Sequence, residues 1–300
     1  MTISENNNNK INKNYKLIIG RHCSSGKPNY LWGATKEAVS YNANALMVYL
    51  GAPQNSVRRP VSELKVPEFK QVLVENKIDI DNVIVHGPYQ VNLARETDSD
   101  TFDFSVKFLQ EEIARMEEIG LKTIVIHPGS ALNAPVKEAL DNVAKGINLI
   151  LEKSSTVRIA LETMCGRGSE IGINFEQLKY IMDEIEQKDR VGVCWDTCHL
   201  YAAGYNIKNN LEAVIKEFDQ KIGLNKLWVI HVNDSSQELG AKIDRHENIG
   251  FGNIGSETLK KIVWHPKFDG IPKLLETPRN KDPESGKDFT KEIKMLKKQT

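Results

Sequence analysis

Residues 194–199, Cys-Trp-Asp-Thr-Cys-His, place four potential metal ligands within six positions. Asp196 and His199 lie three residues apart, and Cys194 and Cys198 are interleaved with them. Histidine, cysteine and aspartate are common zinc ligands in proteins. However, no second closely spaced cysteine pair completes a structural zinc site, so the cysteines are better interpreted as buried reduced thiols. The other two cysteines of the chain are Cys23 and Cys165.

Six short apolar segments of the chain end in, or next to, a histidine, aspartate or glutamate. A single histidine after a strand is usually a hydrogen-bonded surface residue, and a single glutamate usually pairs with lysine or arginine. Gathered together, however, carboxylates repel one another and imidazoles lose their hydration unless cations are present. The set therefore predicts bound Zn²⁺, with Mn²⁺ or Fe²⁺ as alternatives. Its members are His86, His127, Glu162, Asp196, His231 and Glu276.

Two further stretches supply more candidate ligands. His199 follows Asp196, and residues 242–255 (KIDRHENIGFGNIG) contain Asp244 and His246 two positions apart. Alternate residues of an extended segment point the same way, so these two side chains can reach one ion. The total of nine candidates is too many for one four-coordinate ion, and it suits about three ions if one carboxylate bridges.

The elements that must position these residues are eight apolar segments rich in valine and isoleucine. Continuous apolar runs of this length are typical of parallel strands buried on both faces. The segments between them have helical periodicity, clearest in 103–120, which ends at Gly120, and in 136–154 and 175–187. The pattern predicts an α/β fold, a (β/α)8 TIM barrel with its active site at the C-terminal ends of the strands. The expected strands are 16–20, 45–50, 82–86, 123–127, 157–162, 191–195, 227–232 and 272–276.

An open, doubly wound sheet is the alternative architecture. Such sheets usually have fewer strands and often carry a glycine-rich phosphate turn after the first strand, which this sequence lacks. We expect residues 1–15 to be a disordered polar tail and residues 16–300 to form a single domain.

Composition limits the classes of protein. The 300 residues are 40% hydrophobic and 27% charged, which is ordinary for a globular protein. No apolar run is long enough for a membrane span, and the N-terminus lacks the apolar core of a signal peptide, so we expect a cytoplasmic protein. The 40 basic and 40 acidic residues argue against attachment to nucleic acid by bulk charge, but not against a local basic surface.

Seven stretches of the chain resemble the endonuclease IV family of apurinic/apyrimidinic (AP) endonucleases. The resemblance runs from about residue 16 to the end with the motifs in order, and all nine of the family's ligand positions hold the expected residue types. The stretches are HGPYQVNLA (86–94), HPGS (127–130), LETMCGRGSEIG (161–172), VGVCWDTCHLYAAGYN (191–206), HVNDS (231–235), DRHENIGFGNIG (244–255) and LETP (275–278).

The resemblance implies a TIM barrel that holds three zinc ions, with the cysteines uninvolved. It assigns His86, His127 and Glu162 to one ion, and Glu162, Asp196, His231 and Glu276 to a second. His199, Asp244 and His246 would hold the third. Glu162 would also be catalytic, because it would orient the attacking water or hydroxide.

The implied reaction is hydrolysis of the phosphodiester 5′ to an abasic site in duplex DNA. The products would be a 3′-hydroxyl and a 5′-deoxyribose phosphate, and trimming of 3′ ends (as a 3′-phosphatase or phosphodiesterase) is a further candidate activity. The resemblance also implies nucleotide flipping and a monomeric enzyme with no membrane partner. Expected DNA contacts are His22, Gln54, Asn55, Tyr89, Gln90 and Arg245, with Arg58 and Arg59 as additional phosphate contacts.

The first strand departs from the family pattern Gly-x-His-Val-Ser. Here the sequence is GRHCSS, with Cys23 in place of valine, while His22 is retained. We expect His22 near the DNA backbone rather than on a metal ion. His265, in VWHPKF, is expected on the surface away from the strand ends.

Two other functions fit parts of the pattern. A sugar isomerase or epimerase of the xylose isomerase type shares histidine and carboxylate ligands at strand ends, with one or two metals, but it has no use for the set His199, Asp244 and His246. A protein that binds damaged DNA without cutting it does not need a metal-activated hydroxide, and the intact ligand set argues against it.

Overall fold

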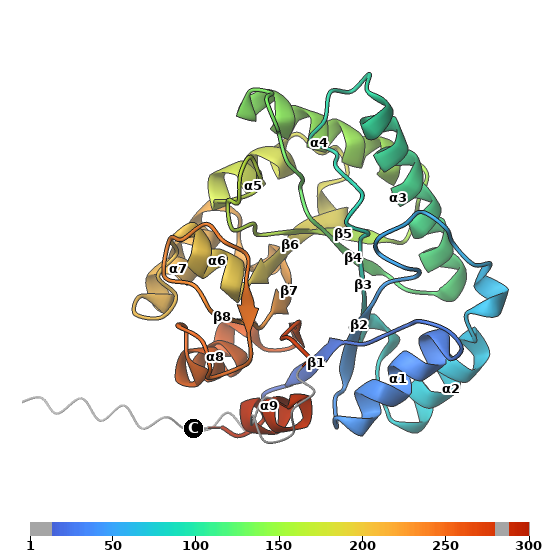
Figure 1. Ribbon diagram of the computed structural model, residues 1–300, viewed down its shortest axis with the longest axis vertical. Helices are drawn as coiled ribbons and strands as arrows, with labels where there is room; N and C mark the ends of the chain where they lie inside the picture. Colours follow the sequence, from blue (N-terminus) through green and yellow to red (C-terminus); the bar gives the residue numbers. More distant parts are fainter. Residues whose placement is uncertain (1–13, 280–287, 300) are drawn as a thin grey trace, which may run out of the picture.

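Eight parallel strands close into a barrel in the order β1-β10-β7-β6-β5-β4-β3-β2 (Figure 1). The computed structural model describes residues 14–279 and 288–299. All eight predicted strands are present with ends within two residues of those expected, so the predicted TIM barrel is confirmed. The strands are β1 (Ile18–His22), β2 (Ala45–Val48), β3 (Val83–His86), β4 (Thr123–Ile126), β5 (Arg158–Glu162), β6 (Val191–Asp196), β7 (Leu227–His231) and β10 (Pro272–Leu275).

Helices surround the barrel and alternate with the strands (Figure 1). The predicted helix 103–120 begins earlier, because Ser99 caps it by accepting a hydrogen bond from the Phe102 amide, and it ends at Gly120, whose φ is +93°. The other two predicted helices end a few residues early. The longer helices are α1 (Tyr30–Ser40), α2 (Val66–Glu75), α3 (Asp100–Ile119), α4 (Val136–Leu151), α5 (Phe175–Asp183), α7 (Leu211–Lys221), α8 (Ser256–Val263) and α9 (Phe289–Leu296).

Three short elements lie at the C-terminal end of the barrel and were not predicted. Helix α6 (Thr197–Ala203) follows β6 directly, with the Asp196 carboxylate capping its first turn. Strands β8 (Asp234–Ser235) and β9 (His246–Glu247) pair antiparallel in the connection that follows β7. These elements carry candidate ligands that the barrel strands do not.

The barrel interior is packed with small and medium side chains, and a larger apolar layer lies between strands and helices. Close packing requires Gly20 on β1, because a Cβ atom there would lie 1.8 Å from the Ala45 carbonyl oxygen of β2. The four cysteines are buried free thiols, as predicted. No helix in the described part of the chain is long and apolar enough to cross a membrane.

The start of the described chain is anchored at the N-terminal end of the barrel. Tyr15 donates a hydrogen bond to the Val263 carbonyl at 2.8 Å and packs against Trp264. Tyr15 therefore already belongs to the domain, just before the expected boundary at Lys16, while residues 1–13 of the expected tail lie outside the described residues. Lys273, fully buried on β10, donates to the Tyr15 hydroxyl at 3.0 Å and to the Phe268 carbonyl.

Lys273 gives the fold a pH-dependent stability. Burial lowers its pKa to about 7, although Asp269 partly offsets this. Between that value and the unfolded pKa of roughly 10.4, the unfolded chain binds more protons than the folded one, so stability rises with pH by up to about 1.4 kcal/mol per unit.

Lys273→Met should flatten this dependence. The measurement is urea unfolding of chelator-treated protein at pH 7 and pH 9, with the exposed Lys267→Met as the control. Equal pH dependence in wild type and Lys273→Met would contradict the assignment.

Candidate metal centre

The C-terminal ends of six barrel strands deliver the predicted side chains to one place. His86, Glu162, Asp196 and His231 are the last residues of β3, β5, β6 and β7, and His127 and Glu276 directly follow β4 and β10. Because the strands are parallel, these ends meet at the same rim. All except His127 and Glu276 are buried.

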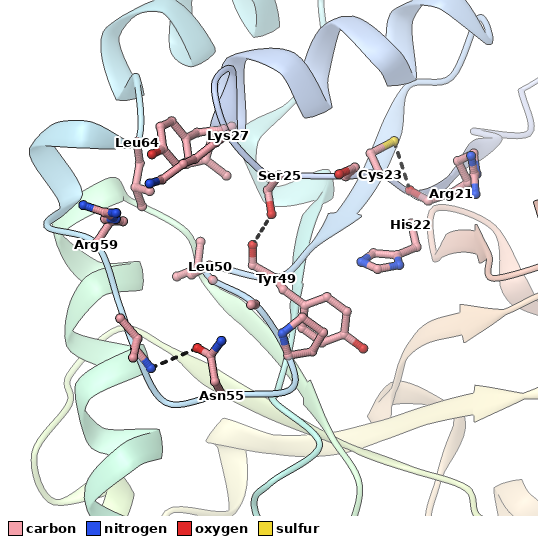
Figure 2. A pocket seen from close by; sticks show the side chains of 18 of the residues that line it. Arg21, His22, Cys23, Ser25, Lys27, Tyr49, Leu50, Asn55, Arg59 and Leu64 are labelled. Atoms are coloured by element: carbon pink, nitrogen blue, oxygen red, sulfur yellow. Dashed lines mark hydrogen bonds between the residues drawn. The ribbon is translucent and has the colours of Figure 1, made fainter.

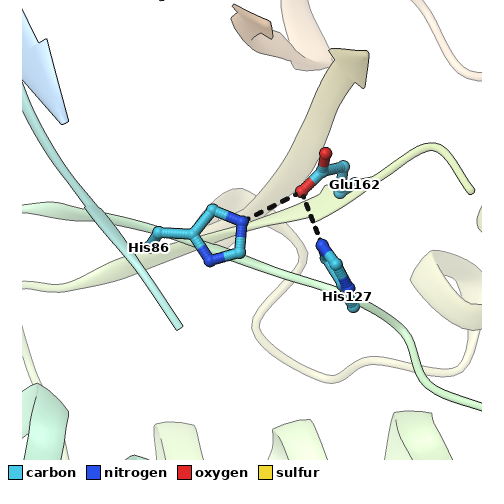
Figure 3. Close-up of side chains that lie close together, drawn as sticks. All are labelled: His86, His127 and Glu162. Carbon is cyan, nitrogen blue, oxygen red and sulfur yellow. Dashed lines mark ion pairs between the residues drawn. The ribbon is translucent and has the colours of Figure 1, made fainter. Parts of the chain in front are cut away.

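The first group joins His86, His127 and Glu162 (Figure 3). Both imidazole Nε2 atoms lie 3.3 Å from the same carboxylate oxygen, Glu162 Oε2. His86 Nδ1 lies 2.8 Å from the Gly87 carbonyl, which can only accept, so Nδ1 donates there and Nε2 is the ring nitrogen that faces Glu162. The group thus directs two ring nitrogens and a carboxylate oxygen toward a common point.

The second group shares Glu162 with the first and adds Asp196, His231 and Glu276. His231 Nδ1 lies 3.1 Å from both Glu162 Oε1 and Glu276 Oε2, and 3.9 Å from Asp196 Oδ2. Glu162 therefore faces one group with each oxygen, which is the arrangement required of a bridging carboxylate.

The third group combines His199 of α6 with Asp244 and His246 from the connection after β7. Asp244 Oδ1 lies 3.2 Å from His199 Nε2 and 3.4 Å from His246 Nε2. His199 Nδ1 is 2.9 Å from the Thr163 carbonyl, which orients the ring so that Nε2 faces the group.

Cys198 lies close enough to Asp196 and His246 to form a further group with them. Burial raises the pKa of this thiol well above its ordinary value, and the Asp196 charge raises it further. Because a thiol binds metal as the thiolate, this environment disfavours Cys198 as a ligand.

The donor set fits divalent cations. Four buried ligand atoms have no hydrogen-bond partner: Glu162 Oε2, His199 Nε2, His231 Nε2 and His246 Nε2. Unpaired buried polar atoms are costly, and bound cations would provide partners for such atoms. Imidazole nitrogens with carboxylate oxygens are ligands that suit Zn²⁺.

The pKa shifts of Glu162 and His231 also indicate that the carboxylates of the centre favour positive charge nearby. Burial opposes ionisation of Glu162, but His231 and His127 lower its pKa well below the usual range. Burial likewise opposes protonation of His231, yet Cys194, Glu276 and Glu162 raise its pKa well above the usual range. The carboxylates thus favour positive charge on His231, which a proton or a bound cation can supply.

His22 lies beside the centre but belongs to none of the ligand groups found among the described residues. Its ring contacts Tyr49 edge-on at a centroid distance of 4.8 Å. Burial lowers its pKa to about 4, so it is neutral near pH 7. His22 lines a cavity of about 560 Å³ between the loops after β1 and β2, together with Lys27, Asn55 and Arg59 (Figure 2).

Most of the other expected DNA contacts lie on exposed loops around the centre. Tyr89 is 59% exposed, and its ring lies 5.8 Å from that of His86. The side-chain amide of Gln90 donates a hydrogen bond to the backbone carbonyl of Gln54, which connects the loops after β2 and β3. Asn55 and Arg245 are also exposed.

The expectation that Arg58 contacts phosphate is wrong. Its Nε donates to Glu112 at 2.7 Å, and the side chain is only 8% exposed. Its Nη1 donates to the Ala52 and Asn55 carbonyls, so Arg58 stabilises the conformation of the loop after β2. Arg59 is half exposed and pairs with Glu63 at 3.7 Å.

His265 lies away from the centre, as expected, but its side chain is only 11% exposed, so the expected surface position is wrong. It precedes the short helix η5 (Pro266–Phe268), which leads into β10 at the opposite end of the barrel. Its Nε2 lies 2.7 Å from Glu212 Oε1.

Two residues that orient the ligands were not identified from the sequence. Asn233 donates from Nδ2 to Asp196 Oδ2 at 2.7 Å and accepts from the Glu276 amide at 2.8 Å. Thr163 accepts from the Asp196 amide at 2.9 Å. Thr163 directly follows Glu162, and Asn233 lies two residues after His231. This closeness to candidate ligands was the only feature of the sequence that could have indicated their role.

The barrel and its strand-end ligands define a xylose isomerase-like TIM barrel, and residues 35–299 match the family of that description. The chain is 46% identical over 283 residues to the probable endonuclease 4 of Acholeplasma laidlawii (strain PG-8A), a match that covers 94% of this chain and 95% of the other. Endonuclease IV from Thermus thermophilus superimposes with a TM-score of 0.77 at 27% identity, covering 90% of this chain and 95% of that one. The chain belongs to the endonuclease IV family of AP endonucleases.

The same barrel occurs in sugar-modifying proteins. A D-tagatose 3-epimerase-like protein aligns with a TM-score of 0.64 at 20% identity, covering 92% of this chain and 96% of that one. This likeness shows a common fold and nothing about activity.

Zinc should stabilise the folded protein strongly. Each ion that binds only the folded chain contributes about 2.7 kcal/mol at 100 times its dissociation constant. For a chain of 300 residues this corresponds to an increase of roughly 4 °C in the unfolding midpoint for each ion. Thermal unfolding of chelator-treated protein with and without Zn²⁺ measures this. Mg²⁺ prefers all-oxygen sites and should have little effect, and an equal gain from Mg²⁺ would contradict a zinc-type centre.

Proposed function

We propose that this protein is a zinc-dependent DNA repair endonuclease. It hydrolyses the phosphodiester 5′ to an abasic site in duplex DNA and leaves a 3′-hydroxyl and a 5′-deoxyribose phosphate. The observation that supports this most strongly is the meeting of nine histidine, aspartate and glutamate side chains in three adjoining groups, two of which share Glu162. Membership of the endonuclease IV family supports the choice of substrate.

The three groups would each hold one zinc ion, with Mn²⁺ or Fe²⁺ as a substitute at one position. Three divalent ions carry +6 and the four carboxylates −4, so about +2 remains to attract a phosphate. The net charge of the whole chain is zero, so this local charge would draw DNA to the rim.

When bound, such ions generate a nucleophile from water near neutral pH and stabilise negative charge on the phosphate and the leaving oxygen. The chain's own contribution begins with Glu162, whose two oxygens face different groups and whose position suits it to orient the attacking water. Asn233 and Thr163 hold Asp196 at a fixed angle.

The abasic nucleotide would leave the helix to reach the rim. A missing base lowers the cost of unstacking to a few kcal/mol or less. Tyr89, an exposed aromatic beside the centre, and Gln90, bonded to Gln54, would fill the space left in the duplex. His22 and Asn55 line the adjacent cavity, and Arg245, between two ligands, would contact phosphate.

Trimming of blocked 3′ ends fits the same centre, because it also breaks a phosphate ester next to a 3′-oxygen. An epimerase function would use the strand-end groups but leave the set His199, Asp244 and His246 without a role. A protein that bound DNA without cleaving it would not need Glu162 to orient an attacking water.

The reaction is tested with an end-labelled duplex that carries one tetrahydrofuran abasic analogue, without added Mg²⁺. The analogue cannot undergo β-elimination, so a nick must come from hydrolysis. We expect a single cut 5′ to the lesion and a loss of about 10²–10⁴-fold or more in Glu162→Gln.

The control for this assay is Glu212→Gln, which alters a carboxylate at the far end of the barrel and should cut normally. Intact DNA after incubation with fully zinc-loaded wild type would exclude endonuclease activity, and sugar phosphates would be the next substrates to test.

Arg245→Ala should weaken DNA binding uniformly across sequences. If Arg245 contacts one phosphate, the slope of log affinity against log salt should decrease in magnitude by about one. Fluorescence anisotropy at several salt concentrations measures the slope. Lys188→Ala, just before β6, removes a charge from the opposite end and should leave the slope unchanged. An unchanged slope in Arg245→Ala would refute the contact.

A further inference from the structure

Asp234 is a fully buried carboxylate that accepts hydrogen bonds from backbone amides along the loop that follows β9. Oδ2 accepts from Gly250 at 2.9 Å and Gly252 at 3.2 Å, and Oδ1 accepts from Ile254 at 2.9 Å and Gly255 at 3.2 Å. Residues 250–255 are thereby wrapped around one side chain.

The glycines of this loop are required by that close approach. A Cβ atom on Gly252 would lie 2.5 Å from Asp234 Oδ1, and Gly250 and Gly255 both have φ of +86°. Asp234 is not a member of the ligand groups found among the described residues, and its oxygens are already occupied by amides. Its role is therefore to fix the backbone rather than to bind an ion.

The wrapped loop begins directly after a candidate ligand. His246 lies on β9, where it pairs with Ser235 of β8, and Asp234 pairs with Glu247. The Asn253 amide donates to the Ser235 carbonyl at 2.7 Å, which closes the loop back onto β8. Asp234 thus anchors both the strand that carries His246 and the segment after it.

A second buried carboxylate, Glu292 of α9, holds the other side of the loop. Its Oε1 accepts from the Ile249 amide at 2.8 Å and from Asn248 Nδ2 at 3.0 Å. Its Oε2 accepts from the Thr277 hydroxyl at 2.8 Å, next to the ligand Glu276. The C-terminal helix is in this way connected to two parts of the centre.

The third ligand group depends on this loop more than the other two groups do. Asp244 and His246 supply two of its three members, and only His199 comes from an element adjoining a barrel strand. The first two groups consist of residues at strand ends, which the barrel itself holds in place. Order in residues 244–255 therefore decides whether the third group is preformed.

We propose that Asp234 and Glu292 are positioning residues that form a carboxylate clasp on residues 246–255. The clasp orders the loop before any ion binds and so sets the affinity of the His199, Asp244 and His246 group for its ion. The inference rests on the proposed function only in taking that ion to be zinc. A preformed site binds more tightly because ordering is not required during binding.

The first test is zinc stoichiometry in Asp234→Asn, in which an amide group would face several N–H donors. After gel filtration, mass spectrometry of the metal should find three zinc ions per wild-type chain and two per variant chain. Titration with excess zinc should restore the third, with an apparent dissociation constant at least about tenfold higher. Retention of three ions with wild-type release into chelator would overturn the proposal.

Glu292 provides a graded pair of variants. Glu292→Ala removes every acceptor and should also release the third ion at least about tenfold faster. Glu292→Gln keeps a carbonyl for Ile249 and turns an amide toward the Thr277 hydroxyl, which can accept, so its zinc content should be near normal. Equal release rates in the two variants would contradict the clasp.

Glu117→Gln is the matched control for a general loss of stability. Glu117, near the end of α3, also accepts backbone amides, from Ser155 and Thr156 at 3.0 Å each, but these partners precede β5 at the opposite end of the barrel. This variant should keep three zinc ions even if its melting temperature falls. Loss of zinc in Glu117→Gln would reduce the Asp234 result to an effect of stability alone and overturn the proposal.

Hydrogen exchange of the metal-free wild type separates failure of the clasp from failure of the proposed function. The clasp predicts that amides 250, 252, 254 and 255 are protected before zinc is added and exchange at least about tenfold faster in Asp234→Asn. Free exchange in the metal-free wild type would refute the clasp whether or not the protein cuts DNA. Protected amides with no DNA cleavage would sustain the clasp and remove the endonuclease.

Discussion

The centre of this structure depends on one buried carboxylate. Glu162 is 1% exposed and has imidazole nitrogens within 3.5 Å on both of its oxygens: His86 and His127 face Oε2, and His231 faces Oε1. An isolated charge at this depth would be prohibitively costly, and partners or metal ions are the means by which proteins stabilise one. The neighbouring strand ends supply those partners, so the barrel's geometry and the electrostatics of Glu162 constrain each other.

Because the barrel is built from parallel strands buried on both faces, most of its strands and strand-end ligands could be predicted from the sequence. A strand buried on both faces is apolar until it reaches the rim, so a histidine or carboxylate at its last position marks both the strand end and a site residue. His86, Glu162 and His231 were recognisable for this reason. Their division into groups came from the resemblance to endonuclease IV, because spacing along the chain does not tell which strand ends adjoin a given ion.

The features that were missed or misjudged depend on partners far away in the sequence. Arg58 looks like a free phosphate contact until Glu112, 54 residues later, is found beside it. Asp234 looks like an ordinary polar residue after a strand until its amide partners, 16 to 21 residues later, fold around it. Hydrogen bonds of this kind leave no periodicity, and the short elements α6, β8 and β9 are below the length at which a pattern can be read.

The ligands at the strand ends and the ligands in the connection after β7 are held in place by different parts of the structure. The D-tagatose 3-epimerase-like protein shares the barrel, and strand-end ligands are what a barrel positions most directly. The set His199, Asp244 and His246 is built differently, from a short helix that follows β6 and a long connection after β7. Barrel packing does not impose the conformation of that connection. The hydrogen bonds to Asp234 and Glu292 do, so the ligand group that draws two of its three members from this connection is also the group whose geometry is held by two carboxylates outside the ligand groups.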